Sequence, residues 1–190
     1  MKKLMSFLAV SIFTVSVFAQ KTLVNDPAHS RIQFTITHLS INEITGNFNK
    51  ADLTINADDK DFTKSKFNFT IDANSVNTNV EARDNHLRSE DFFDVAKFPT
   101  MNFTSTSITE KQKTKYLLNG NFTMHGVTKP ITLQLTYKGS TENPMSKKMT
   151  YSYQVKGVLN RSDYGIGPKF PNAMLSDEVY IKGDFEVSEK

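Results

Sequence analysis

The sequence has 190 residues, of which 38% are hydrophobic, and it contains 15 phenylalanines but no cysteine and no tryptophan. A chain of this length forms one ordinary domain, and without cysteines a core rather than disulfides must hold it together. Two of the 23 basic residues are Lys2 and Lys3, so the remainder nearly balances the 20 acidic ones. The sequence therefore lacks the excess of basic residues that is typical of nucleic-acid-binding proteins, and we expect no nucleic acid as partner.

Residues 1–19 have the pattern of a secretory signal peptide. Lys2 and Lys3 precede an uncharged apolar stretch over residues 4–18, and the stretch ends in Val17-Phe18-Ala19. The stretch is shorter than the roughly 20 residues of a spanning helix, and no later segment comes close. The sequence therefore predicts an exported chain, with residues 20–190 as one domain that has no transmembrane segment.

Apolar residues recur at every second position in many short segments, which is the period of half-buried strands. We expect about eight strands, over residues 31–37, 51–55, 67–73, 101–103, 116–124, 131–137, 149–157 and 179–187. Short connections without helices favour antiparallel pairing, and eight such strands can close into a barrel. The prediction is an all-β, eight-stranded antiparallel barrel, and a sandwich is the alternative.

The same alternation leaves open what the apolar face contacts. An eight-stranded barrel is either filled by side chains or just wide enough for one small ligand. A membrane-spanning barrel would turn the apolar face outward, but the charged end Ser188-Glu189-Lys190 and the absence of tryptophan argue against it. A ligand cavity and a filled core both remain compatible with the pattern.

One short helix interrupts the strands, at about residues 79–90. Thr78-Asn79-Val80-Glu81 has the form of a capping box. Arg83 and His86 share a helical face and could bind an anionic head group such as a diphosphate, with Phe92 and Phe93 as an apolar plug over the barrel mouth. Ordinary solvated charge on the helix is the alternative.

A second cluster, Arg161-Ser162-Asp163-Tyr164-Gly165, follows the 149–157 strand. Arg161 or Tyr164 would contact a ligand at the rim, or an Arg161–Asp163 pair would simply shape the turn. The four histidines have no metal-ligand spacing, so no metal site and no other cofactor is expected. No catalytic motif is present, although an enzyme using Arg83, Asp84 and His86 on a lipid diphosphate is an alternative.

Several motifs resemble those of the YceI-like proteins and cover nearly all of residues 20–190. They are Asp26 with His29-Ser30, Phe34 with His38, Gly46-x-Phe48, Arg83-Asp84-x-His86-Leu87-Arg88-Ser89-x-Asp91-Phe92-Phe93-Asp94, Phe98-Pro99, the segment from Gly120 to Pro130, Arg161-x-Asp163-Tyr164-Gly165 and Asp177-Glu178-Val179. The resemblance implies a lipocalin-like barrel in the bacterial periplasm that binds polyisoprenoid lipids, such as prenyl diphosphates or the tail of a quinone.

Together these observations predict a periplasmic binding or carrier protein for an isoprenoid lipid, without catalytic residues. The alternative is an envelope stress-response or interaction protein with a filled core, and a homodimer is left open. The rim contacts predicted for the head group are Arg83, His86, Phe92, Phe93, Arg161 and Tyr164. The residues predicted to line an apolar tunnel are Phe34, Phe69, Phe103, Leu118, Phe122, Leu133 and Leu135.

Overall fold

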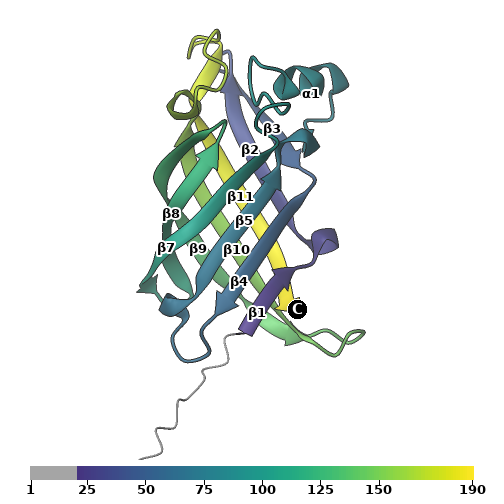
Figure 1. The fold of residues 1–190 in the computed structure, drawn as a ribbon, viewed down its shortest axis with the longest axis vertical. Coiled ribbons are helices and arrows are strands. Elements are labelled where there is room, and N and C mark those ends of the chain that lie inside the picture. The colour runs from purple at the N-terminus through teal and green to yellow at the C-terminus, as the bar shows by residue number, and fades with distance from the viewer. Residues whose placement is uncertain (1–20) are drawn as a thin grey trace, which may run out of the picture.

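The computed structural model describes residues 21–190, so the predicted signal peptide lies outside the described part of the chain. Strands dominate it, and the one α-helix, α1, covers Glu81–Arg88 (Figure 1). The strands are β1 (Lys21–Asn25), β2 (Arg31–His38), β3 (Asn42–Phe48), β4 (Ala51–Ala57), β5 (Lys66–Asp72), β6 (Val76–Asn77), β7 (Thr100–Gln112), β8 (Lys115–Met124), β9 (Val127–Glu142), β10 (Met149–Asn160) and β11 (Leu175–Glu189).

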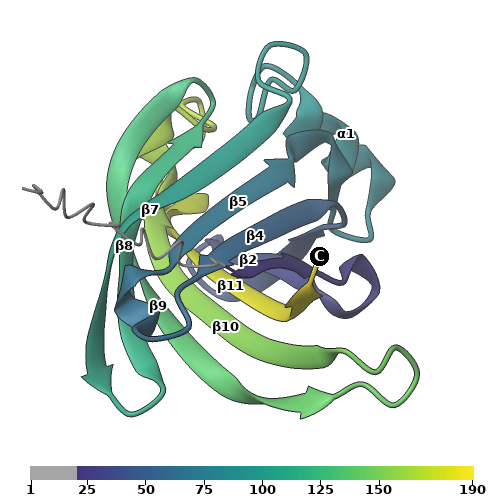
Figure 2. The same ribbon diagram turned by 60° about the horizontal axis from the view of Figure 1, so that its bottom comes forward.

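The strands form one closed antiparallel sheet, which bends back on itself (Figure 2). Closure runs through β1, which pairs with β4 on one side and with the last residues of β11 on the other. Nearer the end that carries α1, β11 pairs with β2, and β2 pairs with β3. Three strands of the barrel are therefore interrupted, and they consist of β1 with β2, β3 with β4, and β5 with β6. The other five are β7 to β11. The predicted eight-stranded barrel is confirmed.

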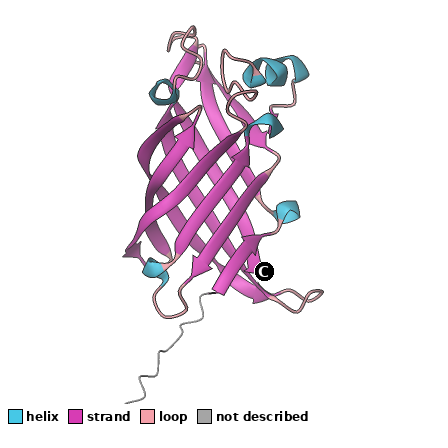
Figure 3. Ribbon diagram, viewed as in Figure 1, coloured by secondary structure: helices cyan, strands magenta, loops and turns pink. Residues whose placement is uncertain are grey.

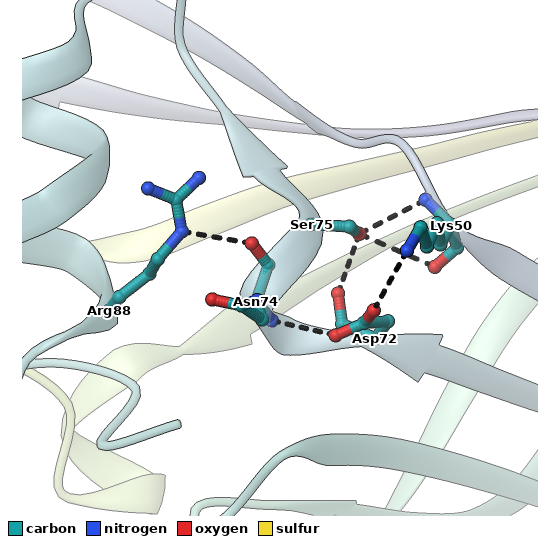
Figure 4. Close-up of polar contacts among 5 residues, drawn as sticks. All are labelled: Lys50, Asp72, Asn74, Ser75 and Arg88. Atoms are coloured by element: carbon teal, nitrogen blue, oxygen red, sulfur yellow. Dashed lines mark hydrogen bonds and ion pairs between the residues drawn. The ribbon is translucent and has the colours of Figure 1, made fainter. Parts of the chain in front are cut away.

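Side-chain and backbone hydrogen bonds fix the interruptions on one side of the barrel (Figure 4). The Ser75 hydroxyl donates to the carbonyl of Asp72 at 2.6 Å and accepts from the backbone N–H of Lys50 at 3.0 Å. Arg88 of α1 donates to the carbonyl of Asn74 at 2.9 Å. These bonds satisfy backbone groups that the interrupted ladders leave unpaired, and they attach α1 to the barrel wall.

The apolar face of the strands points into the barrel, and the end opposite α1 is tightly packed. At that end the rings of Phe62, Phe67 and Tyr153 lie within 6.0 Å of one another, centroid to centroid. Tyr116 and Tyr137 extend the cluster. Offset and edge contacts of this kind stabilise aromatic pairs beyond their buried area. The core therefore closes this end of the barrel.

The other end carries α1 and the β10–β11 connection, which begins with a short 3-10 helix at Arg161–Tyr164 (Figure 3). The predicted capping box is wrong, because α1 begins after Val80, which makes no side-chain cap hydrogen bond. Thr78 instead donates its N–H and its hydroxyl to Asp84, at 2.8 and 2.6 Å. Asn79 has a φ of +61°, so the chain turns before the helix starts and carries Thr78 past the cap position.

Candidate functional site

A cavity of about 400 Å³ lies inside the barrel at the end covered by α1. Its volume falls within the range of about 300–1,000 Å³ that is common for small-molecule sites. The wall is almost entirely apolar, and the polar side chains that line it are His38, Thr78, Arg83, His86 and Arg161. The apolar lining residues are Ile32, Phe34, Ile36, Ile44, Phe48, Ile71, Leu87, Phe92, Phe93, Met101, Phe122, Met124, Leu159, Ile166, Phe170, Met174, Leu175, Val179 and Ile181.

The lining residues that are exposed, His38, His86 and Met174, mark the opening of the cavity. His38 follows the inward alternation of β2, but it ends the strand at the mouth rather than in the core. Above the opening, the rings of Phe92 and Phe170 stack with centroids 5.0 Å apart. Segments 92–93 and 165–175 thus form a partial cover held together by aromatic contacts.

Arg83 is the arginine of α1 that lines the cavity, whereas Arg88 lines the cleft outside the barrel. Its Nε donates to the hydroxyl of Thr78 at 2.7 Å, and its Nη2 donates to the carbonyl of the same residue at 3.0 Å. Both acceptors are uncharged, so the positive charge of Arg83 is not neutralised by these bonds. Its Nη1 takes no part in them. A guanidinium held in this way can bind the oxygens of an anionic group at the mouth.

His86 belongs to an ionic bridge that joins α1 to the cover. Its Nε2 lies 3.1 Å from Oδ2 of Asp91, and Oδ1 of Asp91 accepts from Lys169 at 2.6 Å. The bond from Lys169, with a smaller contribution from His86, lowers the pKa of Asp91 below its ordinary value. The carbonyl of Asp91 also accepts from the N–H of Gly167 at 3.0 Å. Asp91 therefore connects α1 to segment 165–175 of the cover.

Arg161 is buried, with 4% of its surface exposed, and it organises the β10–β11 connection. Its guanidinium donates to five backbone carbonyls at 2.5 to 3.1 Å, those of Ile166, Gly167, Phe170, Leu175 and Ser176. The alternative of an Arg161–Asp163 pair is wrong, because Asp163 pairs with Lys129. The structure therefore places Arg161 at the cavity wall, with its donors directed at the loop.

Tyr164 is buried in the core rather than placed at the rim, with 1% of its surface exposed, and it does not line the cavity. Its ring contacts that of Phe122 edge to face at 5.7 Å, and its carbonyl lies 3.0 Å from Nδ1 of His125. Burial raises the pKa of Tyr164 to about 12. Its hydroxyl is buried and has no hydrogen-bond partner within residues 21–190.

Five of the six predicted rim residues gather in one place, whereas the predicted tunnel residues divide by depth. Arg83, His86, Phe92, Phe93 and Arg161 all line the cavity, and so do the tunnel residues Phe34 and Phe122. The others lie deeper. Phe69, Phe103 and Leu133 line a separate void of about 60 Å³ below the cavity, while Leu118 and Leu135 lie in the packed core and line neither space.

Sequence reasoning missed several inward residues that line the cavity, such as Ile71, Met101, Met124 and Leu159. Each lies at or near the end of its strand next to the α1 end of the barrel. Alternation identifies the inward face but not the depth along the barrel. The position of each inward residue relative to the loops around α1 was the signal that could have identified these four.

The structure brings together two of the three residues of the alternative enzyme, because Arg83 and His86 both line the cavity. Asp84 is linked to Arg83 through the hydroxyl of Thr78, which accepts from Arg83 and donates to Asp84, but Asp84 itself lines a polar cleft outside the barrel. Among residues 21–190, no group of three or more histidine or acidic side chains is arranged to hold a metal ion. Within the same range, no helix has the length and apolar character needed to cross a membrane.

Comparisons with known proteins agree over most of the chain. The family model described as YceI-like domain matches residues 23–187. Protein YceI of Salmonella newport is 38% identical over 183 residues, which are 95% of each chain. The crystal structure of the Campylobacter jejuni YCEI protein matches with a TM-score of 0.73 at 32% identity, covering 82% of this chain and 90% of that one. A polyisoprenoid binding domain from Saccharophagus degradans has a TM-score of 0.66 at 16% identity, covering 90% of this chain and all of that one.

Proposed function

The chain belongs to the YceI-like family, and from this membership and the cavity we propose that it binds an isoprenoid lipid with the tail inside the barrel. The observation that carries the proposal is the cavity of about 400 Å³, which is lined almost entirely by apolar side chains and also by Arg83 and His86 of α1. The structural neighbour from Saccharophagus degradans, which is described as binding a polyisoprenoid, supports the same class of ligand.

An apolar tail matches the wall because the lining offers few polar groups to bind anything else. Each buried methylene contributes about 0.8 kcal/mol, so a branched hydrocarbon chain gains affinity along its whole length. A filled barrel would have no space for such a chain. The cavity therefore favours a binding protein over the alternative of an envelope stress-response or interaction protein with a filled core.

The head group of the lipid would lie beside Arg83 and His86. A diphosphate can accept from Arg83, whereas the head group of a quinone would accept a weaker hydrogen bond at the same place. This proposal involves binding and no turnover, and we extend it to an exported, periplasmic carrier on the strength of the predicted signal peptide.

The test uses the chain from residue 20 onward, extracted with organic solvent and examined by mass spectrometry for a co-purified prenyl lipid. Farnesyl diphosphate and farnesol are then compared by thermal shift and calorimetry. We expect both to bind, and we expect Arg83→Gln to weaken the diphosphate about tenfold to a hundredfold, with little effect on the alcohol. Arg31→Gln is the control, since Arg31 is exposed on β2 and does not line the cavity.

Failure of both ligands to raise the melting temperature, together with an extract free of prenyl lipid, would contradict the proposal. An equal loss of diphosphate binding in Arg83→Gln and Arg31→Gln would contradict the role of Arg83 while leaving the cavity as the tail site.

A further inference from the structure

The cavity and the smaller void beneath it share part of their walls. Four residues, Ile32, Ile71, Phe122 and Ile181, line both the cavity and the smaller void beneath it, so they form a collar between the two spaces. Below the collar, the ring of Phe69 packs against those of Phe103 and Phe185 at 5.7 and 5.3 Å. The tail of a ligand that enters at the mouth meets this layer and cannot continue to the far end.

Glycines in the strands specify the layer beneath the collar. A Cβ on Gly120 would lie 2.4 Å from the ring of Phe103, and one on Gly183 would lie 2.5 Å from the ring of Phe185. Real Cβ contacts are essentially never this short. Each glycine thus provides the space in which a large side chain crosses the interior, so the layer is part of the close-packed structure.

The available depth follows from strand geometry. On β2 the inward residues run from Ile32 at the collar to His38 at the mouth. Six residues at about 3.3 Å span about 20 Å, and a strand tilt of about 40° reduces this to about 15 Å along the axis. An isoprene unit extends the chain by about 5 Å, since it adds four carbon–carbon bonds of about 1.5 Å.

We propose that the collar of Ile32, Ile71, Phe122 and Ile181 sets the length of the bound tail at three to four isoprene units. The inference rests on the proposed function and adds to it a class of ligand, a short isoprenoid whose tail is fully enclosed. Units beyond the fourth would have to remain outside the mouth, where they gain little by binding.

The test measures the affinity of the chain from residue 20 onward for geranyl, farnesyl, geranylgeranyl and octaprenyl diphosphates by calorimetry in a non-micellar cosolvent. We expect the affinity to rise at least about tenfold per unit up to farnesyl or geranylgeranyl diphosphate, and then to change less than about threefold up to the octaprenyl compound. An affinity that keeps rising to the octaprenyl compound overturns the length limit alone. Absence of binding at every length overturns the proposed function as well.

Two variants change the depth in opposite directions. Phe122→Leu opens the collar to the lower void, so the ratio of octaprenyl to farnesyl affinity should rise about tenfold. Ile71→Phe shortens the space, so geranylgeranyl diphosphate should lose about tenfold while geranyl diphosphate loses less than about threefold.

Phe67→Leu is the matched control, because Phe67 is fully buried and lies four residues before Ile71 on the same face of β5, yet it lines neither space. The ratio of octaprenyl to farnesyl affinity in Phe67→Leu should stay within about threefold of the ratio in the parent chain. A threefold change corresponds to well under 1.4 kcal/mol. Variants that bind with unchanged length preference would refute the collar. The measured quantity is a ratio between two ligands on the same protein, so a general loss of stability does not change it. If Phe122→Leu fails to fold, Ile71→Phe still tests the collar.

Discussion

Replacement of Arg161 by methionine should loosen the cover of the cavity and destabilise the protein. Methionine keeps much of the length of the side chain but removes every donor. The carbonyls of Ile166 and Gly167 receive buried hydrogen bonds from Arg161 at 3.0 and 2.7 Å. A buried acceptor left without a donor costs about 1–3 kcal/mol, so these two alone account for about 2–6 kcal/mol. Removal of a buried charge offsets part of this cost.

We expect the free energy of unfolding of Arg161→Met to fall by about 3–5 kcal/mol in urea titrations. Hydrogen exchange should locate the change, with the amides of residues 166–176 losing protection before those of the packed end. Arg31→Met is the control, since Arg31 is exposed on β2 and should change stability by less than about 0.5 kcal/mol. A loss below about 1 kcal/mol in Arg161→Met, or protection lost evenly over the barrel, would refute the reasoning.

Three further predictions concern single side chains. Asp91→Asn should lower the melting temperature at neutral pH. Because the folded-state pKa of Asp91 is lowered from 3.8, its contribution is complete above 3.8 and is lost as the pH falls through the folded-state pKa, so the difference between the two melting temperatures should shrink as the pH falls below 3.8. A difference that stays constant as the pH falls below 3.8 would contradict the ionic bridge. Tyr164→Phe removes a buried hydroxyl without a partner, so urea titration should give a stability unchanged or raised by up to about 1 kcal/mol, and a clear loss would reveal a bound water. Gly183→Ala should cost about 1–3 kcal/mol in the same titration through overlap with Phe185, whereas an unchanged stability would mean that the ring moves aside freely.

The barrel could be predicted from the sequence because alternation reports which face of a strand is buried. Strand β3 was missed, and Gly46 explains why. It stands where an apolar side chain would continue the inward alternation between Ile44 and Phe48. A Cβ at Gly46 would lie 2.3 Å from the ring of Phe34, so the glycine serves packing across the strand pair and removes the local signal.

The site was predicted more accurately at its rim than along its wall. Arg83, His86, Phe92 and Phe93 are neighbours in the sequence, so a single short helix and the turn after it bring them together. Leu118 and Met124 both point inward from β8, yet Leu118 lies in the packed core and Met124 lines the cavity. The distinction depends on how far along the barrel axis each residue lies. Strand pairing determines this position, whereas periodicity gives only the face of the strand.

Closure of the barrel through β1 has a consequence for how the chain folds. Leu23 is paired with Glu189, so the contact that completes the ring joins the first described strand to residues at the far end of the sequence. Loop closure over such a separation is entropically costly and slow, and it cannot begin until the last strand has left the ribosome. Until then the barrel cannot close, and the apolar faces of the earlier strands are not yet enclosed.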